Sequence, residues 1–291
     1  MTATLKGVVL QLSALMIFVM MDTTVKLMTA YFSVMQIIWA RFIFSLLAVS
    51  LVLRISMGRL PWRSRAPGLQ ALRSLLLCGS SVLFTSALAH IPLVDATAVG
   101  FASPLITVAL AALILGEHVT PRRWCGVGIG FLGVMVALRP PFLTGAPLHW
   151  AYLLPLGTAT TFAFYQILTR RLAAIDDSRV TILHTGFAAS IAASLAQPFV
   201  FIAPNPEQWV FLVSVGLLGG VSHGLLVLAY ARAPASLLAP LSYTQLIWAS
   251  VAGVLVFSDW PDTITLLGAA IIAAGGVLTA LPQRNRNRTA I

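Results

Sequence analysis

The sequence from Ala89 to Gly133 reads AHIPLVDATAVGFASPLITVALAALILGEHVTPRRWCGVGIGFLG, and the sequence from Ala231 to Gly275 reads ARAPASLLAPLSYTQLIWASVAGVLVFSDWPDTITLLGAAIIAAG. The two stretches align without a gap at an offset of 142 residues, from position 89 to position 231. The alignment pairs prolines, aromatic residues, acids and glycines: Pro92 with Pro234, Phe101 with Tyr243, Glu117 with Asp259, Gly126 with Gly268, and Gly133 with Gly275. An acid and two glycines that keep register across a turn indicate an internal repeat.

The repeat extends toward the start of the chain in a weaker form. The pattern Asp22-x-x-x-Lys26 resembles Gln166-x-x-x-Arg170 at an offset of 144 residues, from position 22 to position 166. We therefore expect two copies of one unit, the first over residues 1–139 and the second over residues 140–291 with a short polar C-terminal tail.

The composition places the chain in a lipid bilayer. With 59% apolar residues, 9% charged residues and a mean hydropathy of +0.94, a water-soluble domain of 291 residues would have too little charge to cover its surface. Runs that are almost free of charge and long enough to span predict ten helices. These are Val8–Lys26, Val34–Leu53, two spans between Ser74 and Gly116, Trp124–Leu138, Pro140–Thr169, Val180–Pro206, Gln208–Ala231, Ala233–Ser258 and Thr263–Gln283.

Spans of this length without period-two alternation satisfy their backbone as helices rather than as barrel strands. The predicted fold is therefore an all-α integral membrane protein. Five helices per repeat is an odd number, so the second copy begins on the opposite face of the membrane and the two five-helix repeats are inverted. Such repeats place a central cavity between the halves, and alternating access follows from rocking one half against the other.

The basic residues behind the net charge of +10 are concentrated in the loops on one face of the membrane. Fifteen of the 18 Lys and Arg residues, Arg73 among them, are predicted on the face that carries both termini, whereas the other face has Lys26 and Arg139, and Arg41 lies within a span. This asymmetry predicts cytoplasmic N- and C-termini. Basic loops beside a bilayer contact anionic lipids, and because no aromatic residues interleave with them we expect no nucleic-acid partner.

Periodicity identifies candidate cavity residues. In the sixth span, Thr158, Thr161, Phe162, Tyr165 and Thr169 form one helical stripe of hydroxyls and aromatic rings. The walls of a substrate pocket are predicted from aromatic residues: Phe84, Phe101, Phe162, Tyr165, Tyr243 and Trp248. Its polar groups are predicted from Gln166, His184 and His223. The alternative is that the hydroxyls bond carbonyls of their own helix and that small residues, such as those of Gly126-x-x-x-Gly130, serve helix packing.

Two aromatic residues of this set occupy matching positions of the repeat. Phe101 and Tyr243 lie close to Pro104 and Pro240, which perturb their helices. Symmetric aromatic residues beside helix breaks favour a pocket near the middle of the membrane.

Ionisable residues within spans are the remaining candidates, because each costs roughly 2.5 to 3.5 kcal/mol to insert. Asp22 either carries a proton or binds substrate, or it forms a local ion pair with Lys26 one turn away. Arg41 either serves the cavity or extends toward lipid head groups. A neutral His223 in mid-span requires two hydrogen-bond partners, as a core residue or as a ligand.

The pattern Leu115-Gly-Glu-His-x-Thr120, followed by Gly126 and Gly133, resembles the end of an EamA repeat of the drug/metabolite transporter superfamily. Arg41 in the second span also fits that family. Within it, the chain is most similar in general terms to the YddG-type exporters of aromatic and other apolar amino acids. The resemblance implies a bacterial inner-membrane exporter with a small-molecule substrate in a cavity between its halves.

Other functional classes are weighed against this one. The sequence has no His-Glu-x-x-His, no Gly-x-Ser-x-Gly and no paired carboxylates within a span, so we expect no enzyme, and we expect neither metal nor cofactor. A broad multidrug or metabolite exporter and a lipid-linked flippase stay as alternatives. We expect a monomer.

Overall fold

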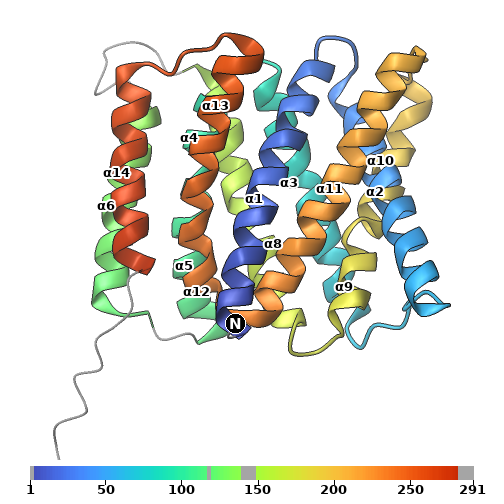
Figure 1. Ribbon diagram of the computed structural model, residues 1–291, viewed down its shortest axis with the longest axis horizontal. Coiled ribbons are helices and arrows are strands. Elements are labelled where there is room, and N and C mark those ends of the chain that lie inside the picture. Colours follow the sequence, from blue (N-terminus) through green and yellow to red (C-terminus); the bar gives the residue numbers. More distant parts are fainter. Residues whose placement is uncertain (1–2, 117–118, 139–148, 281–291) are drawn as a thin grey trace, which may run out of the picture.

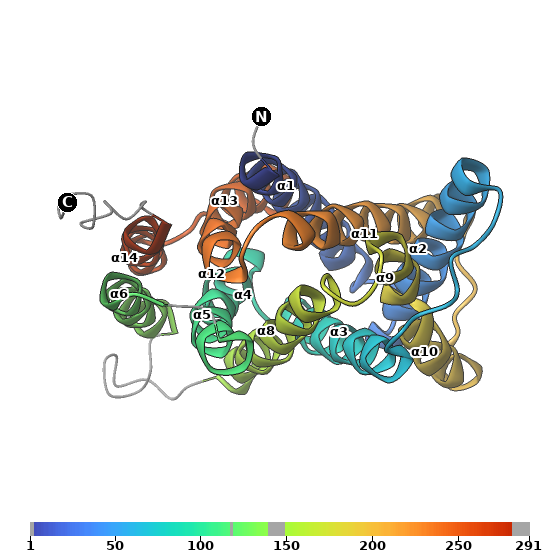
Figure 2. The same ribbon diagram turned by 90° about the horizontal axis from the view of Figure 1, so that it is seen from below.

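The computed structural model describes residues 3–116, 119–138 and 149–280, and all secondary structure in these ranges is helical. The helices stand side by side between two edges that carry the connections (Figure 1), and the end-on view shows α6 and α14 at one extremity and α2 and α10 at the other (Figure 2). The ten longer helices are α1 (Ala3–Met28), α2 (Val34–Met57), α3 (Pro67–Leu88), α5 (Ala102–Leu115), α6 (Pro121–Leu138), α8 (Leu153–Leu172), α10 (Phe187–Val200), α11 (Pro206–Arg232), α13 (Gln245–Phe257) and α14 (Thr263–Ala280). The shorter elements are α4 (Leu93–Gly100), η1 (Trp150–Tyr152), α9 (Ser178–Thr185), α12 (Ala235–Leu238) and η2 (Ala239–Thr244).

Among the described residues, six helical segments are long and apolar enough to cross a membrane, namely α1, α2, α3, α4 with α5, α9 with α10, and α11. Large apolar side chains lie on the outside of the bundle, among them Leu113, Leu195 and Phe199, each more than 70% exposed. An exposed apolar surface of this extent suits lipid rather than water. The all-α prediction is confirmed for the described residues.

The two repeats end their penultimate helices in the same way. Gly116 ends α5 with φ of 64° and bonds the carbonyl of Ala111, and Ser258 ends α13 with φ of 57° and bonds the carbonyl of Gly253. Both pairs are related by the offset of 142 residues. A left-handed residue closes a helix without strain when it is glycine, so Ser258 keeps the geometry of its counterpart at a conformational cost.

The repeat glycines meet across the contact between α6 and α14. A Cβ atom on Gly133 would lie 2.7 Å from the carbonyl oxygen of Gly268, and one on Gly275 would lie 2.5 Å from that of Gly126. Helix backbones approach this closely only where side chains are absent. The packing interpretation of Gly126-x-x-x-Gly130 therefore fits the structure. The two glycine contacts are also related to each other by the offset of 142 residues, as in a two-fold arrangement.

Helical segments are interrupted at three places in the described residues. The first break lies at Phe101, between α4 and α5, three residues before Pro104, which occupies the first turn of α5, where its missing N–H costs nothing. The second is the 3₁₀ segment Ala239–Thr244, and the third lies at Gly186 between α9 and α10. The breaks predicted beside Pro104 and Pro240 are thus present.

Candidate functional site

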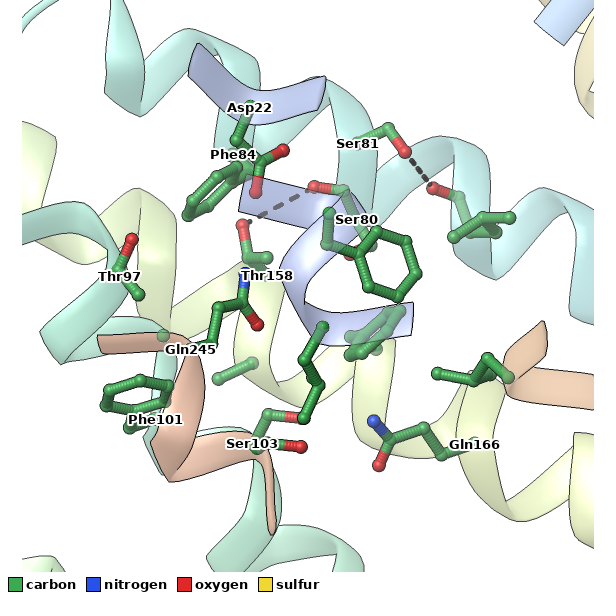
Figure 3. Close-up of a pocket in the computed structure, with 18 of the residues that line it drawn as sticks. Asp22, Ser80, Ser81, Phe84, Thr97, Phe101, Ser103, Thr158, Gln166 and Gln245 are labelled. Carbon is green, nitrogen blue, oxygen red and sulfur yellow. Dashed lines mark hydrogen bonds between the residues drawn. The ribbon is translucent and has the colours of Figure 1, made fainter. Parts of the chain in front are cut away.

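A cavity lies in the middle of the bundle, lined by residues of α1, α2, α3, α4, α5, α8, η2, α11 and α13. It holds about 760 Å³ of space free of protein atoms, including its opening. Binding sites for small molecules combine apolar walls with a few polar groups, as this lining does. In Figure 3, Asp22 and Phe84 are drawn toward one end of the pocket and Phe101 and Ser103 toward the other, with Thr158 and Gln245 between them.

Four phenylalanines form the apolar walls. Phe84, Phe101 and Phe162 were predicted, and Phe18 of α1 joins them. The ring of Phe18 meets the imidazole of His223 edge-on at 4.7 Å between centroids, while Phe162 stacks on Tyr165 at 5.4 Å. Walls of this kind accept a flat ring by stacking or edge contact.

His223 has the two partners that its mid-span position requires. Its Nε2 lies 3.0 Å from Nη2 of Arg41, and its Nδ1 lies 3.1 Å from the hydroxyl of Tyr165. A guanidinium only donates, so Nε2 accepts; the neutral ring then carries its proton on Nδ1 and donates it to the Tyr165 oxygen. Tyr165 is fully buried behind His223 and does not line the cavity.

Asp22 and Arg41 bring a carboxyl group and a guanidinium group to the cavity lining, and each residue is only 6% exposed. Of the two alternatives for Asp22, the local ion pair with Lys26 is not formed, because the Nζ of Lys26 lies 3.0 Å from Oδ2 of Asp259. This ion pair joins α1 to the loop before α14, at the edge opposite the N-terminus (Figure 1). Arg41 turns into the bundle rather than toward lipid head groups, since its partner His223 lies on α11.

Arg73 also departs from its prediction as a loop residue. It is 0% exposed within α3 and donates to the Thr181 carbonyl at 2.7 Å and to the Thr185 hydroxyl at 2.8 Å. Its guanidinium lies 5.1 Å from the Tyr165 ring centroid. The burial of Arg73 could not be predicted from sequence periodicity. A basic residue near the N-terminus of a helix has the same sequence context whether it faces water or a neighbouring helix.

The carboxylate of Asp176 joins two loops at the edge of the bundle that carries the N-terminus (Figure 1). Asp176 accepts from the Ser64 hydroxyl at 2.5 Å, the Arg65 amide at 2.8 Å and the Gln70 side chain at 2.9 Å. Burial acts to raise the pKa of the Asp176 carboxyl, but the hydrogen bonds outweigh it and hold the pKa below its ordinary value. The α2–α3 linker is thereby fixed against the turn that follows α8.

Three buried polar groups of the cavity wall have no hydrogen-bond partner among the described residues: both amide atoms of Gln11, the hydroxyl of Ser103 and Nε of Arg41. Sequence reasoning missed Gln11, Phe18 and Ser103. The available signal was a lone amide on the same face of the first span as Asp22, eleven residues away.

The other predicted residues divide by position. Phe84, Phe101, Phe162, Gln166, His223, Asp22 and Arg41 line the cavity. Gln166 accepts from the Thr107 hydroxyl at 2.8 Å. His184 does not reach the cavity, because its ring faces Trp62 and Phe187.

Trp248 also lies away from the cavity. It is 41% exposed, whereas Gln245, one turn earlier in α13, is a lining residue. The side chain of Tyr243 lies outside the described residues. Within the described ranges, no three His, Cys, Asp or Glu side chains gather as metal ligands do.

Comparisons with known proteins agree with one another. The profile of the EamA-like transporter family matches residues 5–139 and again residues 149–281. The S-adenosylmethionine uptake transporter of Rickettsia prowazekii is 29% identical over 81% of this chain and 79% of its own, and the riboflavin transporter of Rhizobium johnstonii is 29% identical over 80% and 76%. An uncharacterized transporter of Helicobacter pylori is 28% identical over 95% of both chains. A crystal structure superimposes on 95% of both chains with a TM-score of 0.70 at 21% identity, which shows a shared fold.

Proposed function

Because the chain belongs to the EamA-like transporter family and is a multi-pass membrane transporter, we propose that it binds a small ring-bearing metabolite in its central cavity. The observation that carries this proposal is the combination of phenyl walls with one carboxylate and one guanidinium in the same buried lining. A flat ring fits between the phenylalanines, and a zwitterionic head complements Asp22 and Arg41.

Arg41, held by His223, orients the polar end of such a solute. The His223 bond holds Arg41 in place while leaving its Nε without a protein partner. A carboxylate of the solute is the natural acceptor for that N–H, and Asp22 is the acceptor for an ammonium or sulfonium group. Phosphorylated sugars fit less well, because Arg41 is the lone cation among the cavity residues that the structure describes.

The solutes that combine these features are aromatic amino acids and related amino-acid metabolites. The S-adenosylmethionine named for the Rickettsia relatives has the same two parts, an amino-acid head and a ring, whereas the riboflavin named for the Rhizobium relative has a ring without a zwitterion. The family resemblance implied export, but the names of the Rickettsia relatives favour uptake. We propose export as the first hypothesis for direction, with uptake as the alternative that those names favour.

Alternating access is proposed to arise from two inverted five-helix repeats, residues 1–139 and 140–291. The matching helix ends at Gly116 and Ser258 and the crossed glycine contacts of α6 with α14 support a two-fold relation. Interrupted helices at the cavity, as at Phe101, suit a binding site between such repeats.

For location we propose the bacterial inner membrane, with a monomer whose two termini are cytoplasmic. The bonds of Ser64 and Arg65 to Asp176 place the α2–α3 linker beside the turn after α8, so cysteines introduced at Arg63 and Arg179 should react from one side of the membrane. Reaction from opposite sides would contradict the topology.

Counterflow in proteoliposomes tests the function. Phenylalanine, S-adenosylmethionine, riboflavin and an aromatic cation such as ethidium are offered to purified protein. We expect exchange of at least one amino-acid solute, and a loss of exchange in Asp22→Asn and in Arg41→Gln. If ethidium alone is exchanged and Asp22→Asn abolishes that exchange, the result would favour the multidrug alternative. It would contradict the proposal that the solute has a zwitterionic head. Movement of a lipid-linked sugar alone would favour a flippase.

A further inference from the structure

The end of the cavity away from the charges carries unpaired neutral groups. Gln11 of α1 is 0% exposed, and neither its amide nitrogen nor its amide oxygen has a hydrogen-bond partner in the part of the chain that the structure describes. The hydroxyl of Ser103, at the start of α5, is likewise buried and unpartnered. Both residues line the cavity. Native proteins almost always satisfy buried polar atoms, so unsatisfied atoms in residues that line a cavity point to a ligand.

Gln11 and Asp22 mark the two ends of one face of α1. Gln11, Leu15, Phe18 and Asp22 follow at intervals of four, three and four residues, and all four line the cavity. Eleven residues correspond to about 16 Å of helix at 1.5 Å per residue. The phenyl ring of Phe18 therefore lies between the carboxylate and the amide. In Figure 3, Asp22 and Ser103 likewise lie at opposite ends of the residues drawn.

The chemistry of this end differs from that of the charged end. A carboxamide offers a donor and an acceptor side by side, and such a pair is complementary to the edge of a nitrogen heterocycle that presents an acceptor nitrogen or carbonyl beside an N–H. The Ser103 hydroxyl donates or accepts as needed. A phenyl ring has no such edge and would leave all three atoms unpaired.

We propose that Gln11, assisted by Ser103, reads the hydrogen-bonding edge of a nitrogen heterocycle, which makes the preferred solute a heteroaromatic amino-acid metabolite rather than a plain aromatic amino acid. The inference rests on the proposed function, because it takes the charged end of the cavity as the site of the amino-acid head. Gln11 then acts as a specificity-determining residue at the opposite end.

The test compares two probes in counterflow. S-adenosylmethionine has both a heterocycle and an amino-acid head, and phenylalanine has the head with a plain ring. In Gln11→Leu we expect the apparent affinity for S-adenosylmethionine to fall about 10- to 100-fold, as for the loss of a bidentate base contact, with that for phenylalanine unchanged. Ser103→Ala should lower it less. Ser190→Ala is the matched control, because Ser190 has a buried, unpartnered hydroxyl on α10 away from the cavity, and its values should equal those of the wild type.

The thermal stability of each purified variant separates recognition from folding. Gln11→Leu removes an unsatisfied amide, so its melting temperature in detergent should equal or exceed that of the wild type. An equal loss for both probes, or no loss for either, would overturn the inference. If the wild-type protein exchanges phenylalanine but not S-adenosylmethionine, the inference about Gln11 is also overturned while the proposed function stands. If it exchanges neither probe and does not exchange riboflavin, the proposed function itself is wrong.

Discussion

Replacing His223 with Phe tests the buried network that holds Arg41. The substitution keeps a ring for the edge contact with Phe18 but removes both nitrogens, so Nη2 of Arg41 and the hydroxyl of Tyr165 lose their bonds of 3.0 and 3.1 Å. In soluble proteins a buried bond to a charged group contributes roughly 1.5–3 kcal/mol and a neutral one about 1 kcal/mol. Bonds between helices in membranes average only about 0.6 kcal/mol. We expect a loss of unfolding free energy of about 1–3 kcal/mol.

The matched variant Tyr165→Phe removes only the hydroxyl and should cost about 1 kcal/mol or less. Because both changes break the same bond to Nδ1, the double variant should lose less than the sum of the single losses. Stability is measured by thermal unfolding in detergent, and counterflow is measured in parallel. Transport should fall in His223→Phe, since Arg41 loses its orientation, while the protein still inserts in the membrane. Unchanged stability and transport in His223→Phe, or strict additivity in the double variant, would refute the reasoning.

Three further predictions concern the frame around the cavity. Asp176→Asn should lower the melting temperature at neutral pH. Because the pKa of this carboxyl is depressed in the folded protein, the stability that it adds is complete above the ordinary carboxyl range and is lost as the pH falls through the folded pKa. The difference in melting temperature from wild type should therefore shrink in acid, and a difference independent of pH would contradict this. Gly133→Ala should destabilise the protein by about 1–3 kcal/mol in detergent unfolding, because the added Cβ would meet backbone atoms at 2.7 Å. The control Gly128→Ala should have no effect, because its Cβ would meet nothing within 4 Å. Equal changes in stability for the two variants would refute the close contact of α6 with α14. Lys26→Ala should cost at most about 1 kcal/mol because its bond to Asp259 is partly exposed, and exchanging the two charges should restore the loss; a charge exchange that is worse than either single variant would contradict a simple ion pair.

The sequence predicted the arrangement of the chain better than the details of its cavity. The repeat and the apolar runs depend on period and composition, which a bilayer constrains strongly, so the helices and the break beside Phe101 were foreseen. The number of partners of His223 followed from its hydrogen-bonding capacity. Their identity did not, because Arg41 and Tyr165 approach it from other helices.

The misses have a common physical cause. Lys26 lies one turn from Asp22, yet its partner Asp259 comes from the far end of the chain. Gln245 and Trp248 share a helix face by spacing, but the Trp248 side chain remains 41% exposed and only Gln245 reaches the cavity. Distance along one helix is therefore a weak guide where several helices compete for the same side chain.

The central claim is that transported solute occupies the cavity between α1, α3, α5 and α8. Thr158, half-buried on α8, lines that cavity, and a cysteine introduced there into a protein without Cys78 and Cys125 gives one reporter thiol. The rate of its reaction with a membrane-permeant maleimide is measured with and without the solute that the protein exchanges. We expect slower labelling at saturating solute. A rate that stays the same while transport proceeds would contradict occupation of this cavity by the transported solute.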